Sequence, residues 1–129
     1  MNQESSSNTR LAPFLALLKR APESIAFEQV IAVIDANYDY QPTAFVNGVK
    51  GDCIDNKEGT NQGSCKIFAF AKLNALNQLE TLHCFGSNYR EDVLKNPDAD
   101  NHQNIRTYIR HGIDAVQFVQ QPLAPKTAA

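Results

Sequence analysis

Cys65 and the two residues before it are the part of this sequence best suited to covalent chemistry. Gly63 and Ser64 lie where a Gly- and Asn-rich stretch gives way to an apolar run. If Ser64 is a helix N-cap, Cys65 is the first helical residue, and the positive end of the helix dipole favours its thiolate. His102 is the candidate base, and the amides of Ser64 and Cys65 would lie near an oxyanion. This hypothesis predicts a thiol-dependent hydrolase or acyltransferase.

A purely structural role for the same residues is the alternative interpretation. Free cysteine is among the most frequently buried residue types, so Cys65 can be a small apolar residue at the head of a core helix. His102 can equally be a helix-cap or polar contact residue. The two hypotheses differ in one observable, because an enzyme needs the Cys65 sulfur exposed in a cleft within hydrogen-bond reach of an imidazole.

A second group of residues could bind a ligand without catalysis. Asn61, Gly63 and Ser64 belong to a glycine-rich stretch whose backbone amides can approach an anion. Arg90 and Arg106 could add charge-assisted hydrogen bonds to a small anionic ligand. The alternative for both arginines is pairing with acidic residues close to them in the sequence. If the chain is a non-enzymatic binding protein, its partner is expected to be either this small anionic ligand or an unknown protein.

Composition and charge exclude several functional classes. The net charge is −2 without a basic run, which argues against nucleic acid as a partner. No apolar stretch approaches the roughly 20 residues that span a bilayer, and the polar N-terminus lacks a secretory signal. Three cysteines are an odd number and predict reduced thiols in the cytoplasm. No spacing of Cys and His predicts a metal site, and no motif predicts a cofactor.

Helical periodicity predicts the first elements that surround these residues. Thr9 can cap a helix that carries Phe14 on its buried face. Pro22 can open a second helix, with its apolar stripe running to Asn37. The segment from 43 to 46 is expected to be a strand.

The rest of the predicted sheet depends on that first strand. Asn47-Gly48 favours a two-residue hairpin turn, followed by a return strand at 49–50. A later strand at 115–119 can pair with the strand at 43–46.

The central helix is expected at 64–76, where apolar residues occur all round and predict burial on most sides. Asn77 with Glu80 resembles a capping box that starts the next helix. Asp100 with Gln103 is a similar signal for the last helix. The fold class that follows is α+β, a mostly helical single domain with a small antiparallel sheet around a buried central helix.

The domain boundaries follow from composition and from the predicted elements. Residues 1–8 are polar and Ser-rich and are expected to form a disordered tail. The folded domain is expected at 9–121, and 122–129 is expected to be a flexible tail.

The ordered series of motifs along the chain resembles the HopJ type III effector family over roughly residues 23–119. The motifs run from the middle to the end of the chain. They are Tyr40-x-Pro42, Phe45, Asn47-Gly48, Asn61-x-Gly63-Ser64-Cys65-Lys66-Ile67-Phe68-Ala69-Phe70-Ala71, Thr81-Leu82, Phe85-Gly86, Tyr89-Arg90-Glu91-Asp92-Val93-Leu94, Pro97, His102, Asn104-Ile105-Arg106 and Gly112.

The resemblance implies a bacterial protein associated with type III secretion. It does not imply a particular biochemical activity. The polar N-terminus is compatible with an uncleaved type III secretion signal or with an ordinary disordered terminus. The expectation from sequence is therefore a HopJ-like protein of unestablished activity, either a non-enzymatic binding protein or a secreted effector, with the thiol-dependent enzyme as the alternative.

Overall fold

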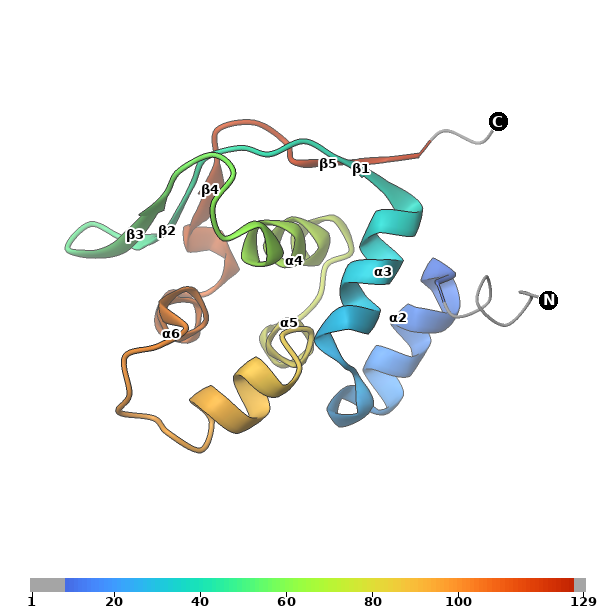
Figure 1. Ribbon diagram of the computed structural model, residues 1–129, viewed down its shortest axis with the longest axis horizontal. Helices are drawn as coiled ribbons and strands as arrows, with labels where there is room; N and C mark the ends of the chain where they lie inside the picture. Colours follow the sequence, from blue (N-terminus) through green and yellow to red (C-terminus); the bar gives the residue numbers. More distant parts are fainter. Residues whose placement is uncertain (1–8, 127–129) are drawn as a thin grey trace.

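A computed structural model describes residues 9–126, and it shows one α+β domain built around helix α4 (Figure 1). A three-stranded antiparallel sheet of order β3-β2-β4 lies on one side of this helix, and α2 and α3 lie on the other. The helical segments α5, η2 and α6 cover the side between them. The predicted fold class is confirmed. Residues 1–8 and 127–129, where tails were predicted, lie outside the described part of the chain.

The N-terminal helices follow the predicted periodicity, with one break. Helix α2 (Leu11–Arg20) buries Phe14, and Pro22–Ser24 then forms a short 3₁₀ turn, η1. Helix α3 (Phe27–Asn37) begins only after Ile25 and the residue that follows it adopt extended conformations. Pro22 therefore starts a turn and not the second helix, because Ile25 must enter the core, where it is fully buried.

The hairpin in the sheet turns later than the sequence predicts. Strand β2 (Phe45–Val49) pairs with β3 (Asp52–Asn56), so the connecting residues are 50 and 51. Asn47 and Gly48 lie inside β2, and the prediction of a turn there is wrong. The side chain of Asn47 is fully buried, and a Cβ on Gly48 would come within 2.9 Å of Thr107 in α6. Packing against α6 overrides the local turn preference.

The C-terminal segment contributes two strands. Strand β4 (Val116–Phe118) pairs with β2, which confirms the predicted pairing of these two segments. Strand β5 (Leu123–Pro125) pairs with β1 (Tyr38–Tyr40), and Leu123 is buried. The folded part of the chain therefore extends past residue 121, where a flexible tail was expected to begin.

The central helix α4 (Gln62–Leu73) starts two residues before Ser64, with Asn61 as its N-cap. Six of its residues are buried, which confirms the all-round apolar pattern. Phe68 is the centre of the core and packs its ring against three other aromatic rings. These rings belong to Phe45, Phe85 and Tyr108.

The predicted capping box at the start of α5 (Gln78–His83) is confirmed. The Asn77 side chain accepts from the Glu80 amide at 2.8 Å, and Glu80 accepts from the Asn77 amide at 3.0 Å. After this helix the chain turns and forms a π-helical segment, η2 (Asn88–Val93).

Helix α6 (Gln103–His111) follows η2, and a short 3₁₀ turn, η3 (Ile113–Ala115), leads into β4. The capping box predicted there is absent. The side chain of Gln103 instead donates to the carbonyl of Asp100 at 2.7 Å, and His102 is the N-cap.

Candidate functional site

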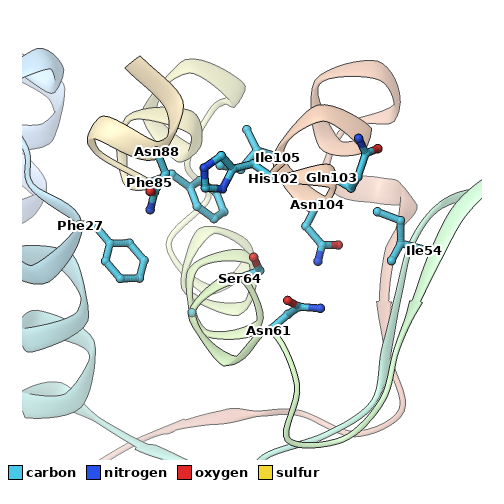
Figure 2. A pocket seen from close by; sticks show the side chains of 11 residues that line it. Phe27, Ile54, Asn61, Ser64, Phe85, Asn88, His102, Gln103, Asn104 and Ile105 are labelled. Atoms are coloured by element: carbon cyan, nitrogen blue, oxygen red, sulfur yellow. The ribbon is translucent and has the colours of Figure 1, made fainter. Parts of the chain in front are cut away.

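A cleft of about 430 Å³ lies where the first turns of α4 and α6 face α3 and β3. Polar side chains share its walls with aromatic and aliphatic ones (Figure 2). The lining residues are Phe27, Ile54, Asn61, Gly63, Ser64, Phe85, Asn88, His102, Gln103, Asn104 and Ile105. None of these described lining residues is Asp, Glu, Lys or Arg. A bound anion would therefore meet no carboxylate of the lining.

Two helices begin at this cleft in the same unusual way. Asn61 and His102 precede α4 and α6 with left-handed backbones, φ 49° and 52°, and neither side chain caps its helix. Left-handed residues other than glycine cost about 1–3 kcal/mol and cluster at functional sites. The amides of an uncapped first turn remain free to bind a ligand, and the helix dipole gives them partial positive charge. This geometry suits negatively charged oxygen atoms.

A network of four asparagine side chains holds the two helix starts in place. Asn56 in β3 accepts from Asn61 at 2.7 Å and from Asn104 at 2.8 Å. Asn47 in β2 donates to the side chain of Asn104 at 2.9 Å. Asn47, Asn56 and Asn104 are each less than 10% exposed. Buried amides of this kind cost about 1–3 kcal/mol when unpaired, so the network fixes α6 against both strands and the start of α4.

His102 is oriented by a carboxylate from the neighbouring π-helical segment. Its Nε2 lies 2.9 Å from Oδ2 of Asp92, and the two side chains are 30% and 49% exposed. The carboxylate favours the tautomer that carries its proton on Nε2, because that nitrogen then donates. The second ring nitrogen, Nδ1, is left for other partners.

Four of the predicted site residues come together in the cleft: Asn61, Gly63, Ser64 and His102. Figure 2 shows the Asn61 and Ser64 side chains pointing into the space that Asn104 enters from α6. A Cβ at position 63 would lie 2.9 Å from the ring of Phe27, so a larger residue there would have to displace this ring. The role of these residues in binding stays a prediction.

Cys65 does not share the cleft. Its side chain is 1% exposed, and its sulfur is hydrogen-bonded by the Tyr40 hydroxyl and by the backbone of Thr43. Burial raises the pKa of the Cys65 thiol, the opposite of what a nucleophile needs. Because α4 starts at residue 62, Cys65 is not the first helical residue, and the prediction that it heads the helix is wrong. Its described contacts include no imidazole.

Arg90 is engaged by backbone carbonyls of the fold, and the role in ligand binding predicted for it stays a prediction. Its guanidinium donates to the carbonyls of Pro22 and His83, both at 3.4 Å, and to that of Ile25. It also lies 3.1 Å from Nδ1 of His83. These bonds join the turn before α3 to the end of α5.

Arg106 is also committed to backbone carbonyls and is 7% exposed. It donates to the carbonyls of Asn96 at 2.9 Å, Pro97 at 3.2 Å and Asn101 at 2.6 Å. It therefore shapes the loop that leads into His102. Neither arginine forms the ion pairs with acidic neighbours that were the alternative prediction.

Sequence reasoning missed the other seven lining residues, among them Phe27, Asn88 and Asn104. Phe27 fits the buried stripe of α3, so periodicity assigned it to the core. Asn104 stands beside Ile105 in one of the sequence motifs, and a polar residue next to a core position was the available signal.

Among the described residues, no group of three His, Cys, Asp or Glu side chains is placed to hold a metal ion. In the same part of the chain, the helices are too short or too polar to cross a membrane.

Comparison with known proteins identifies the family. The model of the HopJ type III effector protein family matches residues 11–123. The chain belongs to the HopJ type III effector family. The curated proteins that were searched include no match to this family member.

A solved structure is similar to this HopJ family member along nearly the whole chain. It is described as the crystal structure of unknown function protein VPA0580. The two sequences are 48% identical, the match covers 91% of this chain and 94% of the other, and the TM-score is 0.85. Neither the description of the family nor that of the solved structure names an activity, so the chemistry of the cleft is the basis for a functional hypothesis.

Proposed function

We propose that this HopJ family member is a non-enzymatic binding protein that holds a small anionic ligand in the cleft between α4 and α6. The observation that carries the proposal is the meeting of two uncapped helix starts at one cleft whose lining contains no carboxylate. The first-turn amides of both helices and the hydroxyl of Ser64 are the donors offered to the ligand.

Binding is favoured over thiol chemistry for a specific reason. The thiol of Cys65 is buried outside the cleft and its pKa is raised, so it is a poor nucleophile at neutral pH. The cleft itself contains groups suited to hold oxygen atoms and offers no sulfur.

The family description supports a role as a type III effector, made in the bacterial cytoplasm and delivered without a cleaved signal. A calmodulin-dependent cyclase fused to the C-terminus tests this in a bacterium with a type III system. Cyclic AMP should accumulate in host cells only when the secretion apparatus is intact. Equal signals from intact and apparatus-deficient strains would contradict delivery by this route.

Binding in the cleft can be tested by NMR with ¹⁵N-labelled protein. The probes are small organic carboxylates, inorganic phosphate and neutral amides of similar size. Anions should shift the amide signals of Gly63, Ser64 and Gln103 most, because these residues form the two helix starts. If none of the anions shifts any of these three amide signals at millimolar concentration, the proposal is refuted.

Two substitutions in the first turn of α4 make a matched pair for this test. Ser64→Leu places a larger side chain in the cleft and should abolish the shifts. Gln62→Leu lies in the same turn at an exposed position outside the lining and should leave them intact. Equal effects of both substitutions would argue against the cleft as the binding site.

A further inference from the structure

His102 is the only titratable side chain among the described residues that line the cleft. Its Nε2 is bonded to Asp92, and no contact among residues 9–126 engages its Nδ1. A ring nitrogen without a protein partner, at the wall of a cleft, is available to a ligand.

The charged groups around this imidazole come from η2, from α6 and from the loop before α6. Asp92 in η2 supplies the carboxylate on Nε2, and Arg106 in α6 donates to the carbonyl of Asp92 at 3.4 Å. In the loop before α6, the carbonyl of Asp100 accepts from Gln103, and the described contacts give the carboxylate of Asp100 no partner. The lining residues from α3, β3 and α4 carry no charge.

The protonation state of Nδ1 decides which ligands it can hold. Neutral imidazole offers a lone pair at Nδ1 and suits a ligand that donates a hydrogen bond. Imidazolium offers an N–H and a positive charge and suits a carboxylate. Histidine is the side chain that proteins use most often for a change of charge near physiological pH.

We propose that the cleft binds a small organic carboxylate together with one proton, which His102 holds between the ligand and Asp92. This inference rests on the proposed function and names its ligand class and its regulation by pH. The proton comes from solvent and attaches to Nδ1, and no covalent bond forms or breaks. Asp92 acts as the counter-ion that keeps the imidazolium stable beside the ligand.

The apolar part of the cleft adds a second requirement for the ligand. The rings of Phe27 and Phe85 and the side chain of Ile54 form part of its wall. A flat apolar body packs against such side chains, while its carboxylate reaches the polar end. Benzoate has both features and is a suitable probe, while acetate lacks the apolar body and benzamide lacks the charge.

Proton uptake makes the affinity depend on pH with a defined slope. Above the titration range of imidazole, each pH unit reduces the affinity for the anion about tenfold, because the protonated fraction falls tenfold. Benzoate remains ionised from pH 5.5 to 8.5, so its own titration does not contribute. The expected result is a continuous loss of benzoate affinity from pH 5.5 to 8.5, which approaches tenfold per pH unit at the alkaline end.

Isothermal titration calorimetry with benzoate measures both the affinity and the number of protons bound. Titrations at pH 8 in buffers of different ionisation enthalpy should show uptake of close to one proton per ligand, and at pH 5.5 close to none. Benzamide and acetate should each bind more weakly than benzoate at pH 5.5. This measurement uses the unmodified chain, so it does not depend on the folding of any variant.

The chain offers a matched control for the histidine. His102→Gln should remove the pH dependence of benzoate binding. His111→Gln should preserve it, because His111 has the same kind of carboxylate partner, Asp52 at 2.6 Å, but lies at the far end of α6. Asp92→Asn removes the counter-ion, so the loss of affinity should begin at a lower pH.

Each outcome separates the inference from the proposed function. Benzoate binding without proton uptake, equal binding of benzamide, or no benzoate binding at pH 5.5 overturns the inference. In any of these cases, NMR shifts in the cleft with other anions leave the proposed function standing. Unchanged cleft signals with every probe overturn both.

Discussion

Gly86 should be one of the least replaceable residues of the fold, and Gly86→Ala tests why. Its φ is +61°, and an added Cβ would lie 2.7 Å from the backbone nitrogen of Phe27 and 3.3 Å from its Cβ. Backbone atoms cannot move aside as a flexible side chain can. The substitution therefore forces the start of α3 away from the segment between α5 and η2.

The expected loss of stability can be worked out from three contributions. Alanine in the left-handed region costs about 1–2 kcal/mol, and overpacking a well-packed site costs about 1–3 kcal/mol. The reduced freedom of the unfolded chain offsets about 0.4–1 kcal/mol. The net decrease in the free energy of unfolding is about 2–4 kcal/mol, which corresponds to roughly 10 °C in melting temperature.

Urea unfolding followed by circular dichroism measures this difference. Gly59→Ala is the matched control, because Gly59 has φ +85° but no atom within 4 Å of an added Cβ. The control isolates the backbone cost, about 1 kcal/mol. If Gly86→Ala destabilises the protein no more than Gly59→Ala does, the argument from contact with Phe27 is wrong.

Three further outcomes are expected. Ala75→Gly should stabilise the protein by about 1 kcal/mol in urea unfolding, because Ala75 follows the C-cap of α4 with φ 54° at an exposed position. An unchanged midpoint would contradict this. Hydrogen bonds from Arg110 and His111 lower the pKa of the Asp52 carboxyl to about 2. Asp52 therefore adds stability above about pH 4, and this stability is lost as the pH falls through about 2. Asp52→Asn should therefore lower the melting temperature at pH 6 and have little effect near pH 2, whereas an equal effect at both would refute the linkage. In native protein at pH 7.5, iodoacetamide should label the exposed Cys53 and not the buried Cys65, and labelling of Cys65 without denaturant would revive thiol chemistry.

The sequence predicted those parts of the fold that depend on local pattern. The apolar periodicity of α4, the capping box of α5 and the pairing of β4 with β2 each follow from short-range signals. The hairpin turn was misplaced because Asn47 and Gly48 contact α6, which is distant in the sequence. A local turn preference is weak compared with the burial of a hydrogen-bonded amide.

The candidate site could be predicted only in part. The cleft residues on α4 were found because glycine and serine at a helix start are recognisable. The N-cap is Asn61 and not Ser64, three residues earlier than predicted, so Cys65 lies in the core and not at the helix start. The roles of Arg90 and Arg106 depend on carbonyl groups presented by turns, and no side-chain pattern in the sequence reveals those.

The pairing of β5 with β1 has a consequence for how the chain reaches its folded state. These strands are separated by most of the domain, so their contact closes a long loop and costs more chain entropy than a local contact does. On a ribosome, β1 stays unpaired until residues 123–125 have emerged. During that interval the exposed edge of β1 is available to a chaperone.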